Sequence, residues 1–491
     1  SNRLYGFDPN VGSSIAVNYL IDYPVYGKGY TQKIPYLDDF NQTLERLRSY
    51  YFNGAYNFDL RYILSLSARI DQSNLFGVNT NQKSVPLWST GLKWNIHKEA
   101  FYNIDWLSEL SLRSTFGYSG NIDRSVTAYT TARLSYNSFN QLPNANLVSP
   151  PNKDLRWEKN RMVNIALDFG LKNRRLAGSI EYFSRKGTDL IGNGEIDPTS
   201  GFTTFRGNVA DMKGHGIDIE LNSKNIVAKD FIWNTTAIFS YAADEIVKYQ
   251  KQTNLANFVQ DAYTSAYRSP SNYAPVIGRP IFSVYSYPWA GLNSNSGLPQ
   301  GYLDGQPSTS YNEIIQNLTN DPEKNLVFHG TALPKYFGAL RNTFNLKSID
   351  LSFNITYRFD YYFRRNSIMY SSLYSTYYGH GDYYARWQNP GDEENTNVPA
   401  MIYPGNINAD SYYRNSSVLV SKGDHIRLQD IRLGYTFKPE ILRNLHISTM
   451  NLFAYINNVT LLWRANKNNI DPDFPFTKPI RTIALGLTCT L

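Results

Sequence analysis

The stretch IDLSFNITYRFDY, residues 349–361, alternates apolar and polar side chains without a break. Its seven apolar positions run from Ile349 to Tyr361, and the positions between them include Asp350 and Arg358. A period of two places the two sets on opposite faces of a β-strand. Such a strand spans about 40 Å at about 3.3 Å per residue, more than an ordinary globular strand. The stretch therefore predicts a tilted strand of a transmembrane β-barrel, with one face toward lipid and the other toward a polar lumen.

The same alternation recurs along the chain, whereas helical periodicity is rare. Further strands are predicted at 50–58, 62–70, 88–96, 110–118, 163–171, 176–182, 217–221, 231–241, 281–291, 336–344, 431–437, 450–456 and 483–491. Short turns and long connections alternate between them, as in outer-membrane barrels, where the long loops are extracellular. The long loops are expected near 72–86, 120–158, 187–213, 247–333, 363–425 and 458–478. The segment 281–291 breaks this alternation, so we expect it to belong to an extracellular hairpin rather than to span the membrane.

The composition agrees with an all-β membrane protein. The 491 residues include 39 Tyr, 26 Phe and 8 Trp, yet the mean hydropathy is −0.43. Aromatic girdles at both membrane interfaces, together with a polar lumen, account for this combination. The rings predicted to face lipid as anchors are Trp88, Trp94, Trp233, Phe353 and Phe453. No apolar run is long enough for a transmembrane helix, and no apolar signal-peptide region follows Ser1, so we expect the gene product to begin upstream.

A series of short motifs runs along the chain in a fixed order. They lie at 69–77 (RIDQSNLFG), 86–94, 112–121, 155–159, 214–220, 334–338, 386–392, 425–433 and 470–473 (IDPD). In this order they resemble the SusC/RagA family of TonB-dependent outer-membrane transporters. The resemblance implies an antiparallel barrel of roughly 22 strands with a plugged lumen, of which this chain supplies the C-terminal part. The plug, the TonB box and roughly nine N-terminal strands are then expected outside this sequence.

The resemblance also implies a function, namely nutrient import across the outer membrane of a Gram-negative bacterium. The cargo of such a transporter is an oligosaccharide or an oligopeptide, and the residues do not choose between them. A SusD-like surface lipoprotein would form the lid, and the TonB–ExbB–ExbD machinery would act through the plug. The alternative is a barrel of this kind that serves as a structural subunit of a larger outer-membrane assembly or secretion complex. A secreted all-β glycan-binding protein or glycosidase is a third interpretation.

The sequence carries no motif of a known catalytic centre. It has no H-E-x-x-H, no G-x-S-x-G and no phosphate-binding loop, and the single Cys489 excludes an internal disulfide. We therefore expect no enzyme, no metal and no cofactor, and the scattered basic residues do not indicate nucleic-acid binding. We interpret Asp471-Pro472-Asp473 as a turn with solvated charges.

Two groups of residues are candidates for contact with cargo or partner. The first comprises the polar residues predicted to face the lumen, Asp350, Asn354, Arg358 and Arg432, which either bind one another or touch the substrate. The second is an aromatic segment without strand periodicity, containing Tyr370, Tyr374, Tyr377, Tyr378, Tyr383, Tyr384 and Trp387. Exposed rings mark binding surfaces, here for sugar faces or for the lid. The same rings could instead pack the long loop on itself, and the sequence leaves both interpretations open.

Overall fold

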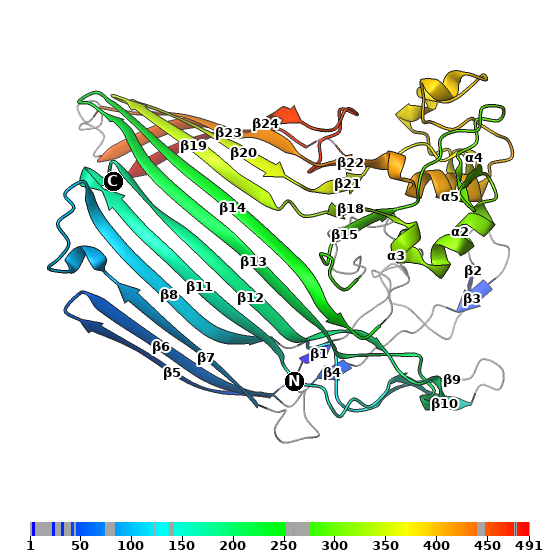
Figure 1. Cartoon of the computed structure of the whole chain (residues 1–491), viewed down its shortest axis with the longest axis horizontal. Helices are drawn as coiled ribbons and strands as arrows, with labels where there is room; N and C mark the ends of the chain where they lie inside the picture. The colour runs from blue at the N-terminus through cyan, green and yellow to red at the C-terminus, as the bar shows by residue number, and fades with distance from the viewer. Residues whose placement is uncertain are drawn as a thin grey trace. The chain divides into compact units, whose positions relative to one another are not determined.

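The computed structural model describes residues 2–4, 22–24, 31–33, 41–43, 46–73, 84–121, 123–136, 142–251, 259, 275–438, 447–475, 477 and 479–490. Figure 1 shows the strands and helices of the chain, which divides into two compact units. The smaller unit comprises 1–51, 69–86 and 123–157, and the larger unit comprises 52–68, 87–122 and 158–491.

The smaller unit contains short paired strands. β1 (Asn2–Leu4) pairs with β4 (Asn41–Thr43), β2 (Asp22–Pro24) pairs with β3 (Thr31–Lys33), and β9 (Thr131–Tyr136) pairs with β10 (Pro143–Ser149). Ala128 and Leu155 are buried in this unit, and Asn152 donates its backbone N–H to the carbonyl of Ala128 at 3.0 Å. The predicted loop 120–158 therefore contains a hairpin of its own.

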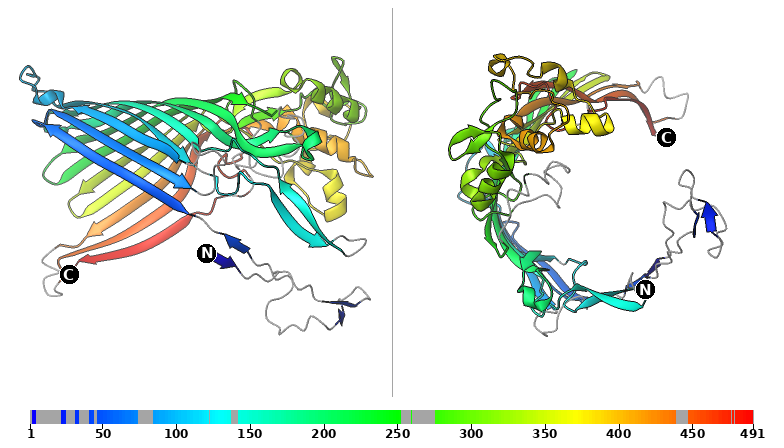
Figure 2. Two further views of the ribbon diagram at one scale, coloured as in Figure 1. Left: turned by 90° about the horizontal axis from the view of Figure 1, so that it is seen from below. Right: turned by 90° about the vertical axis from the view of Figure 1, so that its right-hand side faces the viewer.

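One antiparallel sheet of thirteen strands dominates the chain. Its order is β5 (Leu47–Phe58), β6 (Tyr62–Ser73), β7 (Ser84–Trp94), β8 (Leu107–Asn121), β11 (Glu158–Leu171), β12 (Leu176–Glu195), β13 (Thr204–Val227), β14 (Phe231–Tyr249), β19 (Tyr336–Leu346), β20 (Ile349–Phe359), β23 (His425–Thr436), β24 (Thr449–Arg464) and β25 (Thr482–Thr490). In Figure 2 these strands follow one another in colour order from blue to red. Neighbours in the sheet are therefore neighbours in the sequence, apart from the inserted segments.

Tight turns join the strands at one end of the sheet. Asp59 and Leu60 link β5 to β6, and Lys347 lies between β19 and β20, all three with positive φ angles of 52° to 55°. Asn173, with φ 62°, lies in the short η4 (Lys172–Arg174) between β11 and β12. Asp and Asn adopt this left-handed conformation more readily than other side chains do. The tight turns at this end of the sheet therefore depend on a few residues in the left-handed conformation.

The two faces of the sheet differ in chemistry, as the alternation predicts. Register pairs place Ile180 opposite Ile219, and Ile219 opposite Phe239, on one face. The intervening positions lie on the other face, where Arg113 binds Asp168 at 2.8 Å and Arg341 binds Asp430 at 3.2 Å. The apolar face is exposed along its length, which suits contact with lipid rather than with water.

The fourteen predicted strands and the structure agree closely. Thirteen of them correspond to the thirteen strands of the sheet. The fourteenth, 281–291, does not join it, as expected from its position, because only β15 (Ser283–Ser286) forms there and pairs with β18 (Val327–Thr331). β20 is shorter than predicted, since Asp360 has φ 59° and ends the strand before Tyr361, which is buried.

The segment 187–213 is mostly strand rather than loop. β12 continues to Glu195 and β13 starts at Thr204, with pairs from Leu190↔Ala210 to Glu195↔Thr204. The sequence does not show this extension because the pairing passes through Gly192 and Gly194, which obscure the alternation. Only the connection around η5 (Pro198–Ser200) remains a turn, in which Asp197 accepts a hydrogen bond from the Thr199 N–H at 2.9 Å.

Phe453 does not lie on the face that the sequence predicts. It is paired with Gly434 on the polar face, and the guanidinium of Arg432 lies 4.9 Å from its ring centre. The alternation of 450–456 is weak, because its two faces carry Met450, Leu452 and Ile456 against Phe453 and Tyr455. Trp88, Trp94, Trp233 and Phe353 do lie on the apolar face, and their contact with lipid remains a prediction.

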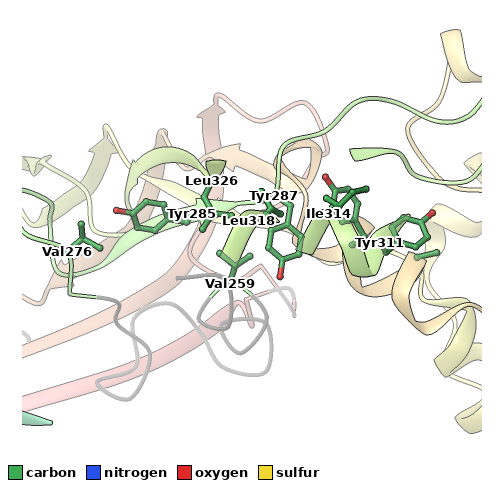
Figure 3. Packing of buried hydrophobic residues seen from close by; sticks show 10 residues of the cluster. Val259, Val276, Tyr285, Tyr287, Tyr311, Ile314, Leu318 and Leu326 are labelled. Atoms are coloured by element: carbon green, nitrogen blue, oxygen red, sulfur yellow. The ribbon is translucent and has the colours of Figure 1, made fainter. Parts of the chain in front are cut away.

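The segments 275–333 and 360–424 fold together into a body that we name the loop module. Its elements are β15, β16 (Gly301–Leu303), β17 (Gln306–Ser308), α2 (Tyr311–Asn320), α3 (Pro322–Asn325), β18, β21 (Tyr362–Arg364), α4 (Tyr370–Thr376), η6 (Gly381–Ala385), η7 (Asp392–Glu394), α5 (Ile407–Asn415), η8 (Ser417–Leu419) and β22 (Val420–Lys422). Its core contains Tyr285, Tyr287, Tyr311, Ile314 and Leu318 (Figure 3), together with Tyr412. Among the described residues, no helix is both long and apolar enough to cross a bilayer.

The two faces make a testable prediction for β20. Ile355→Arg should destabilise the full-length protein in lipid vesicles by about 2–4 kcal/mol, because it places a charge on the face expected to contact lipid. Thr356→Arg, one residue further along on the polar face, should cost much less. Urea unfolding of the two variants measures the difference, and equal losses would contradict the assignment of the faces.

Candidate functional site

The four predicted lumen-facing residues share one face of the sheet but do not form one cluster. Asp350, Asn354 and Arg358 alternate along β20, and Arg432 lies opposite Ser352. Arg432 forms an ion pair with Asp350 and also donates to Asn451 Oδ1 at 3.0 Å. Arg358, at the far end of β20, belongs to a different group of charges. Asp350, Arg358 and Arg432 therefore form ion pairs within the chain, whereas Asn354 Oδ1 is buried without a hydrogen bond. The exposure of the four residues to a lumen remains a prediction.

A β-bulge brings the second group of charges onto the polar face. Asn354 pairs with Asp430 and Ile355 with Leu428, so Gln429 is an extra residue in β23. Its side chain donates to Asn457 Oδ1 at 2.8 Å. A bulge changes which residues face each way. As a result Arg427 and His425 lie on the same face as Asp430. In a regular strand they would point to the opposite face, because they are an odd number of residues away from it.

The segment between β24 and β25 binds to these cations. Asp473 forms an ion pair with Arg358 at 2.5 Å and lies 3.2 Å from His425 Nε2, and Asp471 forms an ion pair with Arg427 at 2.5 Å. The side chain of Arg427 is only 2% exposed. Burial by itself would raise the pKa of Asp473, but the hydrogen bond from His425 and the charges of Arg358, His425 and Arg427 lower it to about 2.

Asp471-Pro472-Asp473 is a turn, as predicted, but its charges are not solvated. Asp471 Oδ1 accepts the Asp473 N–H at 3.1 Å, and both carboxylates are largely buried against β20 and β23. A cavity of about 720 Å³ opens beside them, lined in part by Arg427, Arg464 and Arg481. The sequence signal for this network was Arg427, a cation that requires an anion once it is buried.

Within the loop module, a buried arginine holds three segments together. Arg364 Nη1 donates to Asn415 Oδ1 at 2.7 Å and to the Val259 carbonyl at 3.0 Å, and Nη2 donates to the Tyr285 carbonyl at 2.6 Å. The guanidinium presents its donors in a fixed fork, so these acceptors must keep their relative positions. Arg364 therefore fixes β15, β21 and α5 to one another.

Asp382 organises the part of the module that carries the aromatic segment. It accepts from Arg365 and from the Ser367 hydroxyl, each at 2.5 Å, and Ser367 also contacts the Tyr413 hydroxyl at 3.0 Å. Burial opposes the charge on Asp382, yet hydrogen bonds from His380, Ser367 and Arg365 hold its pKa well below the usual range. The carboxylate therefore stays ionised near neutral pH and ties 380–385 to 365–367.

The aromatic segment divides into buried and exposed rings. Trp387 is 7% exposed, packs with Leu292 and Ala400, and donates its indole N–H to Glu393 at 2.9 Å. Tyr370 is also buried and donates to the Pro399 carbonyl at 2.7 Å. Trp387 and Tyr370 thus stabilise the loop itself, and Tyr374 and Tyr383 are half-buried beside this core.

Three tyrosines of the segment are free to meet another molecule. Tyr377, Tyr378 and Tyr384 are 89%, 79% and 86% exposed. Tyr403, 81% exposed, lies with its ring centre 5.1 Å from that of Tyr374 and was not identified from the sequence. Its neighbours in the sequence are not aromatic, so no pattern marked it.

Known proteins are similar to this chain over most of its length. A family described as TonB dependent receptor-like, beta-barrel, matches residues 1–459. The chain belongs to this family. TonB-dependent receptor P39 of Formosa agariphila is 27% identical over 466 residues, which cover 85% of the chain and 42% of P39. TonB-dependent receptor SusC of Bacteroides thetaiotaomicron is 31% identical over 216 residues, which cover 42% of the chain and 21% of SusC. The chain spans less than half the length of these relatives.

Solved structures agree on the fold. The RagAB peptide transporter superposes with a TM-score of 0.69 at 21% identity, over 92% of this chain and 47% of that chain. The RagAB peptide importer in its open-open state gives the same TM-score over 90% and 46%. Together with SusC, these similarities confirm the sequence-based identification as SusC/RagA-like and imply an outer-membrane location. The relatives are receptors and not enzymes, as expected for this chain.

Truncating a buried ring should destabilise the loop module strongly, whereas truncating an exposed ring should hardly change its stability. Trp387→Ala should destabilise the loop module by about 3–5 kcal/mol, because it empties a packed site and removes the indole donor of Glu393. Tyr384→Ala should change its stability by less than about 0.5 kcal/mol. Limited proteolysis of the full-length protein, with cleavage scored within 275–424, would distinguish them. Equal protection of the two variants would show that Trp387 is not a core residue.

His329 predicts how the stability of the loop module depends on pH. Burial, with a smaller effect of Arg364, lowers the pKa of His329 to about 4, and its Nε2 lies 2.7 Å from the Ser286 hydroxyl. The unfolded segment takes up a proton below about pH 6.5, whereas the folded one stays neutral until about pH 4. Stability should therefore fall by about 1–2 kcal/mol from pH 7 to pH 5.

Hydrogen exchange of the backbone of 283–286 and 327–331 at the two pH values measures this loss. The variant His329→Gln keeps a polar group near Ser286 but cannot bind the proton, so it should lose most of the pH dependence in this range. Asp382 does not contribute to the change between pH 7 and pH 5, because its lowered pKa affects stability only below about pH 4. Identical pH profiles for His329→Gln and the parent would rule out His329 as the cause.

Proposed function

We propose that this chain forms the C-terminal wall of a nutrient importer of the outer membrane, energised through TonB. The observation that carries the proposal is a thirteen-stranded sheet with one apolar and one ion-paired face, in a chain of the TonB-dependent receptor family. The apolar face suits lipid, and the polar face suits a water-filled or plugged lumen. The short turns then lie in the periplasm and the loop module outside the cell.

We propose a SusD-like surface lipoprotein as the partner at the outer end. The structural neighbours carry the name RagAB peptide transporter, and among the described residues the loop module is a large folded body beyond the strands. Its exposed rings, Tyr377, Tyr378 and Tyr384, offer the aromatic side chains that dominate protein interfaces. The cargo would be an oligosaccharide or an oligopeptide; RagAB transports peptides by name, and tyrosine rings suit either cargo.

A triple variant tests the role of the exposed rings. Tyr377→Ala/Tyr378→Ala/Tyr384→Ala should reduce both lipoprotein pull-down and growth on the cognate nutrient, because at interfaces a dominant aromatic anchor contributes about 2 kcal/mol or more. The amount of protein in the outer membrane should not change, since the three rings are outside the core. Tyr302→Ala, a less exposed tyrosine of the same module, is the matched control.

The outcome also separates import from a structural role. Lipoprotein binding without any nutrient uptake, in the parent protein as well as in the variants, would favour a barrel that serves as a scaffold. Unchanged binding and uptake in the triple variant would remove these rings from the interface. A drop in the amount of membrane protein would instead assign them to folding.

A further inference from the structure

Three cations lie side by side on neighbouring strands of the sheet. Arg161 of β11 is directly opposite Lys186 of β12, and Lys186 is directly opposite Lys213 of β13. All three are on the apolar face. Arg161 lies four residues from Ile165, and Lys186 lies four residues from Tyr182, so each points to the same side of its strand as that apolar or aromatic residue. Arg161 and Lys213 are exposed and Lys186 is half-buried. The row therefore lies on the mainly apolar face, at the end of the strands away from the short turns.

Such a row is unfavourable unless an anion binds it. Like charges directly opposite each other across two strands are destabilising. Lys213 has one counter-charge, Glu245, at 2.6 Å. Within the described segments, Arg161 and Lys186 have no ion pair, and Lys159 adds a further exposed cation two residues from Arg161 on the same face. The positive charge of the row exceeds what the described side chains neutralise.

The surroundings of the row indicate which anion it would meet. Tyr118 is paired with Arg161, and the Trp88 ring lies 5.7 Å from that of Tyr118. Tyr182 lies on the same face, four residues from Lys186 and directly opposite Ile165, and Ile180 lies two residues further toward the short turns. Aromatic and aliphatic side chains therefore lie beside the row and on its side toward the short turns. Cations next to aromatic and aliphatic side chains are typical of the interface between headgroups and hydrocarbon.

We propose that Arg161, Lys186 and Lys213 bind the phosphate groups of an anionic lipid in the outer leaflet. The inference rests on the outer-membrane orientation proposed above, in which this end of the strands lies toward the cell exterior. Phosphate oxygens accept charge-assisted hydrogen bonds, and the Arg161 guanidinium can make two to one phosphate. The lipid acyl chains would then lie along the aliphatic side chains of β11 to β13. Bound lipid would neutralise the repulsion that the row otherwise carries.

The test compares two variants of the full-length protein in mild detergent. Arg161→Gln/Lys186→Gln/Lys213→Gln removes the row. Lys172→Gln/Lys224→Gln/Lys229→Gln removes three exposed cations near the turns at the opposite end, so it has the same net charge. Native mass spectrometry measures binding of bisphosphorylated lipid A, of the same lipid without phosphates, and of inorganic phosphate.

We expect the row variant to bind bisphosphorylated lipid A about 100-fold more weakly than the parent, from about fivefold per basic residue at an anionic surface. The control variant should bind like the parent, and the lipid without phosphates should bind weakly to all three proteins. Equal binding by the two variants would overturn the proposal. Equal affinity for inorganic phosphate and for the lipid would replace it with a free-anion site. Nutrient uptake is measured separately, so loss of import with intact lipid binding would contradict only the proposed function.

Discussion

The structure depends on one constraint, which is that backbone N–H and C=O groups of strands placed in hydrocarbon must pair with each other. Each unpaired group there costs several kcal/mol. The thirteen strands meet this requirement with a continuous antiparallel ladder, interrupted by few register shifts. At the shift around Gln429, a side-chain hydrogen bond to Asn457 accompanies the irregularity. Once the ladder is fixed, alternation assigns every side chain to one face or the other.

Charge on the polar face is balanced between strands that are adjacent or one strand apart. Arg113 and Asp168 lie on adjacent strands, whereas β20 lies between Arg341 and Asp430. Asp473 reaches the polar face from a connection and meets Arg358 there. Removing one partner of so buried a network would leave an uncompensated charge, which is far more costly than losing a surface ion pair. The connection between β24 and β25 is therefore part of the wall.

The sheet could be predicted from the sequence and the loop module could not, for a physical reason. A strand with two different faces shows a period of two in any short window, so thirteen strands were identified with errors mainly at their ends. Trp387 packs against Leu292 and Ala400, which have no periodic relation to it. Asp473 likewise meets a cation 115 residues away. Phe453 was misassigned because both faces of its segment are apolar, so local pattern alone could not choose between them.

Because β14 pairs directly with β19, the sheet and the inserted residues 250–335 could change independently in evolution. The two strands run in full register from Phe231↔Leu346 to Tyr241↔Tyr336, although residues 250–335 intervene. A folded insertion that leaves and returns at adjacent points adds little constraint to the strands it joins, because closure entropy grows only slowly with loop length. Lineages could therefore lengthen, shorten or exchange this insertion while the ladder keeps its register. Diversification would then concentrate in the insertion, and homologous walls would remain superposable after their outer surfaces had lost all resemblance.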